Sequence, residues 1–133
     1  MVKLALFSIL ILSMQASIGQ NAYQSQLYLL TKRLNDFEKI NLTIRKADKS
    51  FLLKKLDLTK DFNRLGEEAR MEAINSNLNS ELADNIFMTT VSANSRLTFL
   101  ESYFRYRSEL YFTNYQREKV IFLSLFLKVK ALE

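Results

Sequence analysis

Few side chains in this sequence could perform chemistry. The chain has no histidine and no cysteine, so it lacks the commonest general base, the usual thiol nucleophile and the main transition-metal ligands. Carboxylates can act in pairs, and Glu67, Glu68 and Glu72 lie close together in the sequence. Arg64 and Arg70 lie nearby, at spacings typical of a solvated helical face. We therefore expect no catalytic residue, no metal and no cofactor, and we predict that the protein is not an enzyme.

Aromatic and basic side chains are interleaved between residues 103 and 115. Tyrosine and arginine dominate the energetics of protein interfaces, so these types are candidate contacts for a partner or ligand. The candidates are Tyr103, Tyr106, Arg107, Tyr111 and Tyr115. The pattern also resembles a nucleic-acid platform, but on a helix these side chains point in different directions. Core packing with hydroxyls at the rim explains them better than base stacking does, and we do not expect nucleic acid as a partner.

Four lysines fall in one heptad register opposite an apolar seam, namely Lys32, Lys39, Lys46 and Lys60. On a continuous helix they would form a basic outer stripe. Such a stripe is usually solvated surface; the alternative is specific binding to an anionic glycan, a lipid or a nucleic acid.

Asn41 begins the triplet Asn41-Leu42-Thr43, which is an N-glycosylation sequon. In a secreted chain Asn41 is a candidate acceptor, which would make the protein a glycoprotein. A glycan cannot be buried, so modification requires the core to run through Ile40 and Ile44 instead of Asn41. The alternative is an unmodified triplet inside a helix.

The first 19 residues have the pattern of a secretory signal peptide. Lys3 provides the positive charge, residues 4–12 are apolar except for Ser8, and Ser17 and Gly19 are the small residues that signal peptidase requires. An uncleaved membrane anchor is the alternative, but the apolar run is about half the ~20 residues of a spanning helix. We predict cleavage after Gly19 and a secreted, extracellular protein.

The remaining residues, 20–133, favour a single all-α domain. Without cysteine the fold has no disulfides, and without proline and with one glycine, Gly66, it lacks the residues that build tight β-turns. An apolar residue also recurs every seven positions, which predicts helices of the coiled-coil type. This heptad seam consists of Tyr23, Leu30, Phe37, Ile44, Phe51, Leu58 and Leu65. We predict a compact up-and-down bundle of three or four helices.

Several positions are candidate helix boundaries. Short polar side chains at residues 48–50 or 57–59 could cap a new helix, and the Asn- and Ser-rich residues 75–80 predict a connection between helices. A third helical pattern starts near Ser80. The pair Thr113 and Gln116 has the spacing of a capping box, which predicts a further break near Thr113.

The segment 120–127 is apolar except for Ser124 and is flanked by basic residues. It is too short to span a bilayer. We expect a central helix that is almost fully buried; the alternatives are a strand or a membrane-surface helix.

These expectations together favour contact over catalysis. The leading hypothesis is a secreted, non-enzymatic bundle that binds an extracellular protein through a helix face. Two alternatives stay open: a carrier of lipid or another apolar ligand held between the helices, and a protein that acts at an anionic membrane surface. Oligomerisation through helix faces is compatible with all three.

Overall fold

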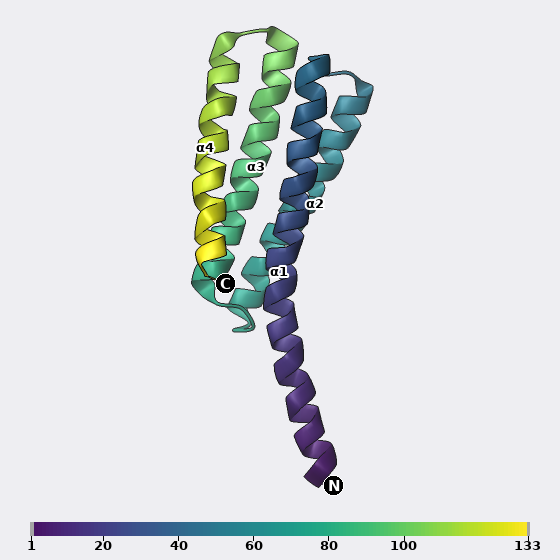
Figure 1. Ribbon diagram of the computed structural model, residues 1–133, viewed down its shortest axis with the longest axis vertical. Coiled ribbons are helices and arrows are strands. Elements are labelled where there is room, and N and C mark those ends of the chain that lie inside the picture. The colour runs from purple at the N-terminus through teal and green to yellow at the C-terminus, as the bar shows by residue number, and fades with distance from the viewer. Residues whose placement is uncertain (1, 133) are drawn as a thin grey trace.

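The computed structural model describes the backbone of residues 2–132 and the side chains of residues 22–132. Four helices follow one another in the chain: α1 (Val2–Ile44), α2 (Lys49–Ile74), α3 (Ser80–Tyr106) and α4 (Glu109–Ala131). Each helix reverses the direction of the one before it (Figure 1). The protein is therefore an up-and-down helical bundle, and the predicted all-α class is confirmed.

The predicted signal peptide, residues 1–19, lies outside the residues whose side chains are described. Its cleavage, and the domain boundary at residue 20, stay predictions. In the part of the chain that was described, no helix combines the length and the apolar character needed to cross a membrane.

Short polar side chains start three of the helices. The carboxylate of Asp48 accepts a hydrogen bond from the Phe51 amide, 2.9 Å away, and the Asn79 side chain accepts one from the Leu82 amide at 3.1 Å. Ser108 caps α4 in the same way. These bonds satisfy amides that have no partner within the helix. The predicted boundaries at residues 48–50 and 75–80 are thereby confirmed.

Two other predicted breaks are wrong. The helix α2 continues through residues 57–59, where the apolar seam on either side keeps the chain helical. The turn between α3 and α4 lies at Arg107 and Ser108 and not at Thr113. A capping-box spacing can occur by chance inside a helix, and Thr113 lies in the second turn of α4.

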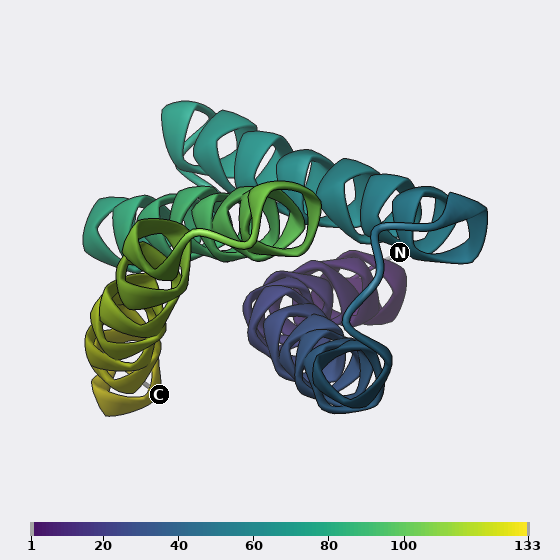
Figure 2. The ribbon, with the colours of Figure 1, turned by 90° about the horizontal axis from the view of Figure 1, so that it is seen from above.

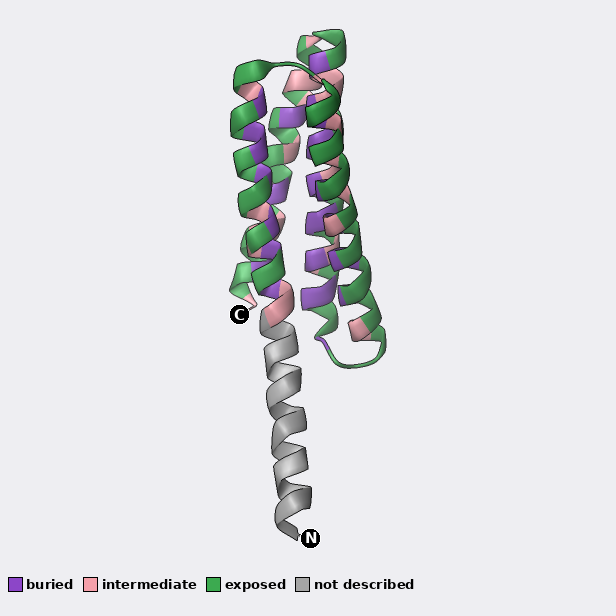
Figure 3. Ribbon diagram, turned by 90° about the vertical axis from the view of Figure 1, so that its right-hand side faces the viewer, coloured by how far each residue is buried: buried purple, intermediate pink, exposed green. Residues whose placement is uncertain are grey.

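The heptad seam forms the core of α1 and α2. Its members that are buried include Leu30, Phe37, Phe51, Leu58 and Leu65. Figure 3 shows the buried residues along the inward sides of the helices and the exposed ones outside. The seam is interrupted only where the chain turns, since Ile44 is the last residue of α1 and lies half exposed.

The helix α3 is the centre of the bundle and packs closely against both α2 and α4. Seen from above, α1 stands apart from α3 and α4 (Figure 2), and its contact with them is made by long side chains. Gly66 of α2 lies directly against α3. A Cβ atom there would lie 2.5 Å from Oγ1 of Thr90 on α3, so only glycine lets these two helices come so near.

Candidate functional site

A buried ionic network joins three of the helices. Arg96 of α3 donates two hydrogen bonds to the carboxylate of Glu38 on α1, from Nε to Oε1 at 2.9 Å and from Nη2 to Oε2 at 2.6 Å. The Tyr115 hydroxyl of α4 donates to the same Oε2 at 2.5 Å. Both charged side chains are at most 4% exposed. A bidentate pair of this kind fixes both distance and orientation, so the network sets how far α1 stands from α3 and α4.

Aromatic rings complete the surroundings of this network. The Arg96 guanidinium lies over the Phe122 ring, 4.7 Å from its centre. Burial, and then the negative charge of Glu38, raise the pKa of Tyr115 well above its usual value, so the phenol stays protonated and remains a donor. The carboxylate, the guanidinium and the hydroxyl of the network are hydrogen-bonded to one another. The network is therefore suited to holding helices together, and it offers no free acid or base to a substrate.

The sequence analysis did not select Glu38 or Arg96, although a signal was present. Arg96 follows Ala93 by three positions and precedes Leu100 by four, so it falls on an apolar stripe of α3. Glu38 likewise stands between Leu34 and Asn41 on the inner side of α1. Charges of opposite sign on two apolar stripes indicate a buried pair, because neither is stable there alone.

The aromatic candidates between residues 103 and 115 are divided between the core and the surface. Tyr115 is buried and turned towards Glu38, so its ring is not at the surface of the folded chain, and its role as a partner or ligand contact stays a prediction. Tyr103 is partly buried and packs on Phe112, with ring centres 4.8 Å apart. Tyr106 is 67% exposed and its ring lies 5.8 Å from that of Tyr111.

Two turns meet at the end of the bundle where Tyr106 lies. Arg45 directly follows α1 and Arg107 directly follows α3, and both have left-handed backbones, with φ of 57° and 53°. The Arg107 guanidinium donates a 2.7 Å hydrogen bond to the Arg45 carbonyl and so joins the two turns. Exposed apolar residues lie beside them. We call this set the turn-end surface: Ile44, Arg45, Tyr106, Arg107 and Leu110.

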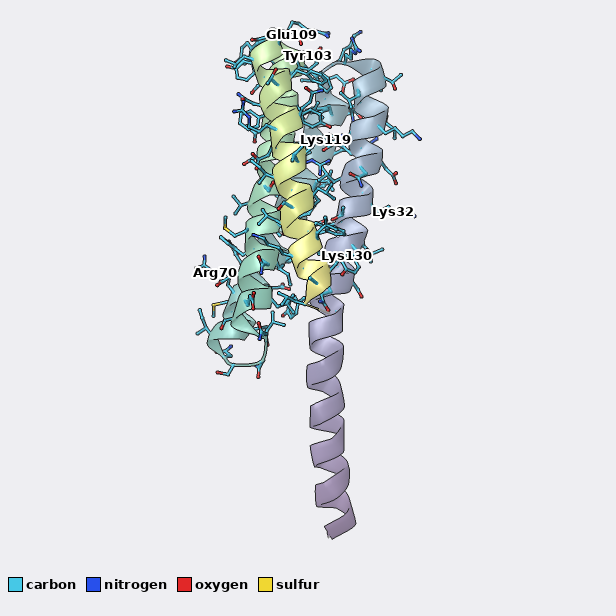
Figure 4. All side chains as sticks on the ribbon, turned by 60° about the vertical axis from the view of Figure 1, so that its left-hand side comes forward. Lys32, Arg70, Tyr103, Glu109, Lys119 and Lys130 are labelled. Carbon is cyan, nitrogen blue, oxygen red and sulfur yellow. The ribbon has the colours of Figure 1, made fainter. Side chains whose placement is uncertain are left out.

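The basic stripe does not form as a single surface. Lys32 and Lys39 are exposed on α1, and Lys32 points away from α4 at the edge of the bundle in Figure 4. Lys46 lies in the turn after α1, and Lys60 lies on α2. The heptad register passes through a turn, so the four lysines do not lie on one continuous helix.

Asn41 is buried, with 7% of its surface exposed, and its Nδ2 donates to the Phe37 carbonyl at 2.8 Å. The core does not run through Ile40 and Ile44, since both are about half exposed, so the condition for modification is not met in the folded chain. The acceptor nitrogen of the sequon is therefore engaged in the folded chain, where a glycan would not fit. Modification of Asn41 itself stays a prediction.

The segment 120–127 is helical, but it is not a buried central helix. Phe122 is buried, whereas Val120, Leu123 and Leu127 are between 53% and 69% exposed. Because α4 lies at the edge of the bundle (Figures 1 and 4), only one of its sides meets other helices. The apolar run is wider than the side of α4 that α3 and α1 can cover.

A carrier of lipid or another apolar ligand, one of the alternatives, would need an apolar cavity between the helices. The aromatic side chains pack on one another, as Phe122 does on Phe126. A hollow of about 720 Å³ lies between α1 and α2, but six of its nine lining residues are charged, among them the ion pair of Arg33 and Asp61. Such a lining does not suit a lipid chain.

Among residues 22–132, no group of three or more acidic side chains is placed to hold a metal ion. The fold and the surfaces described above thus define a four-helix bundle protein whose accessible features are exposed contact surfaces. Comparisons with models of protein families, with curated proteins and with solved structures found no match to this chain.

Proposed function

We propose that this protein is a secreted, non-enzymatic helical bundle that binds an extracellular protein through the turn-end surface. The observation that carries the proposal is the hydrogen bond from Arg107 to the Arg45 carbonyl. It joins two turns that are 62 residues apart in the sequence into one surface. Tyr106 and Leu110 are exposed there by 67% and 65%.

The composition of the turn-end surface supports a protein partner. Tyrosine and arginine are the types most often found as energetic anchors of interfaces. The conformational entropy that they lose on binding is smaller when they are already held in place. Tyr106 packs beside Tyr111, and Arg107 is held by Arg45. Export is supported by the pattern of residues 1–19, which would place the surface outside the cell.

The left-handed backbone at Arg45 and Arg107 is a second support. A residue other than glycine in this conformation costs about 1 kcal/mol or more, and helix ends with this geometry usually carry glycine. Arginine at both positions is therefore unfavourable for the fold alone. Selection for the guanidinium groups at this surface would account for it.

The test exploits this strain. The chain is expressed in secreting cells and recovered from the medium. Its first residue there should be Gln20. Its partner is isolated by crosslinking from Tyr106. We expect Arg107→Gly and Tyr106→Ala each to weaken partner binding about tenfold, or about 1.4 kcal/mol. Arg107→Gly should change the melting temperature little, because the relief of left-handed strain by glycine offsets the loss of the exposed hydrogen bond to the Arg45 carbonyl.

The matched control is Ile74→Ala, which removes a side chain of similar exposure at the opposite end of the bundle. It should bind the partner as the unchanged chain does. Equal affinity of all three variants would refute the turn-end surface, and a chain retained inside the cells would refute export.

A further inference from the structure

The outer face of α4 is an apolar stripe that no other described helix covers. Val120, Leu123 and Leu127 are spaced by three and four residues, so they lie on one side of the helix, and each is more than half exposed. Buried Phe122 and Val129 mark the opposite side, which packs on the bundle. The stripe therefore points away from the core.

Two pairs of cations border this stripe. Arg117 and Lys128 are eleven residues apart, about three helical turns, and so are Lys119 and Lys130. Helical geometry places the first pair on one flank of the stripe and the second pair on the other. Figure 4 shows Lys119 and Lys130 along α4, the helix nearest the viewer.

These four cations have no carboxylate partner among residues 22–132. The ion pairs of the described chain involve other residues. Lys119 and Lys130 lie 5.6 and 6.0 Å from the ring centres of Tyr115 and Phe126, contacts that orient an ammonium group without neutralising it. Lys128 borders a hollow that also contains Glu81, but the two form no ion pair.

The single acid in this part of α4 does not lie on the outer face. Glu118 is partly buried, and its carbonyl oxygen accepts a hydrogen bond from Ser92 of α3 at 3.5 Å. Helical geometry turns its side chain about 160° from Val120. The outer face between residues 117 and 131 is thus apolar along its middle except for exposed Ser124, and its charged residues are the four cations on its edges.

We infer that this outer face of α4 docks on anionic membrane surfaces. A helix lying in the headgroup region places its apolar stripe about 5–10 Å deep, and lysine or arginine on each flank extends its charge up to the phosphates. The α4 face has both parts in this arrangement. This site is separate from the turn-end surface and does not depend on the proposed protein partner.

Two other occupants fit the face less well. A second copy of the chain would bring two sets of cationic flanks together, and like charges across an interface are unfavourable. A protein partner is usually contacted by aromatic and arginine anchors, with lysine depleted. The stripe has no aromatic residue and three of its four bordering cations are lysines.

Vesicle co-sedimentation of the purified chain tests the inference. We expect partition onto phosphatidylcholine vesicles containing phosphatidylserine to exceed partition onto pure phosphatidylcholine at least tenfold, and to fall as NaCl rises from about 0.05 to about 0.5 M. The double variant Leu123→Gln/Leu127→Gln should bind about tenfold more weakly. Lys128→Gln/Lys130→Gln should weaken binding and also reduce its salt dependence.

Matched controls come from α2. Leu53 and Leu56 are exposed to a similar extent and are three residues apart, and Lys54 and Lys60 are exposed lysines. Leu53→Gln/Leu56→Gln and Lys54→Gln/Lys60→Gln should each stay within about twofold of the unchanged chain. Any apolar residues retained before Gln20 are the same in every variant. Differences in vesicle binding between the variants therefore come from the substituted residues of α2 or α4.

Three outcomes would overturn the inference. The first is equal partition onto neutral and anionic vesicles, and the second is equal loss of binding by the α2 and α4 variants. The third is a vesicle-free dimer, seen by analytical ultracentrifugation and abolished by Leu123→Gln/Leu127→Gln, since the stripe would then be covered by a second copy. Circular dichroism of each variant confirms that a loss of binding is not a loss of helix.

Discussion

The residues that decide how this bundle closes are charged and not apolar. Arg96 and Glu38 are removed from water, which is expensive for each ion, and the cost is offset by their two hydrogen bonds, by Tyr115 and by the Phe122 ring. Apolar packing by itself is compatible with many orientations of α1 about its own axis. The bidentate pair accepts one geometry, so it specifies the orientation of α1 more than it adds stability.

Removing one member of this network should therefore cost more than removing all of it. We expect Arg96→Met to lower the free energy of unfolding by about 3–5 kcal/mol, because Glu38 is left buried without a counter-charge. The triple variant Glu38→Leu/Arg96→Met/Tyr115→Phe should lose clearly less. Urea titration followed by circular dichroism measures both. A triple variant less stable than Arg96→Met would show that the pair stabilises the bundle outright.

At the scale of the elements, the close approach of α2 and α3 contrasts with the distant position of α1. Gly66 allows the close approach of α2 and α3, and its neighbour across the interface is the buried Thr90. The Thr90 Oγ1 donates a hydrogen bond to the Phe87 carbonyl at 2.6 Å. Glycine is unfavourable within a helix by about 1 kcal/mol relative to alanine. Its presence in the middle of α2 is explained by the space that the second helix occupies.

Gly66→Ala should destabilise the protein in spite of its better helix propensity. The new Cβ would lie 2.5 Å from Thr90 Oγ1, and a buried threonine cannot move away freely, so we expect a loss of about 1–3 kcal/mol. In a Thr90→Ala background the 2.5 Å contact is absent and the Phe87 ring, 3.2 Å away, is the closest neighbour that remains, so Gly66→Ala should cost much less or become neutral. Thermal unfolding of the four proteins gives the comparison, and the same loss in both backgrounds would contradict it.

At the scale of the whole molecule, no side chain ordinarily titrates near neutral pH, because the chain has neither histidine nor cysteine. On the acid side, burial by itself would raise the pKa of Glu101, but hydrogen bonds from Lys55 and Arg105, at 2.8 and 2.9 Å, outweigh it and lower the pKa below 4.5. On the alkaline side, the pKa of Tyr115 is raised from 10.0.

These two shifts predict a plateau of stability with opposite losses at its ends. A carboxyl group with a lowered folded pKa stabilises the protein above its unfolded pKa, so this contribution is lost as the pH falls below about 4.5. A phenol with a raised folded pKa stabilises it below its unfolded pKa, so that contribution is lost as the pH rises above about 10. Urea midpoints measured from acid to alkaline pH report the profile.

Two variants separate the ends of this profile. Tyr115→Phe should flatten the alkaline decline and leave the acid one intact, and Glu101→Gln should do the reverse. A decline above pH 10 of unchanged size in Tyr115→Phe would show that other groups cause it.

The sequence by itself determined the class of fold and most of its divisions. Heptad spacing, missing proline and capping side chains are local properties, and they located Phe37, Phe51 and Leu58 in the core and the helix starts near Asp48 and Ser80. Helix formation and capping depend on neighbours within a few residues, so they can be recognised without knowing what lies across the bundle.

Only the tertiary structure decided which side of each element meets another. It turned Tyr115 inward to Glu38, left Val120 and Leu127 facing outward, and placed Arg107 beside Arg45. These outcomes depend on residues far apart in the sequence, such as the 77 positions between Glu38 and Tyr115. An apolar run predicts that a helix needs a neighbour, but how much of its surface is covered depends on how many neighbours the fold brings to it.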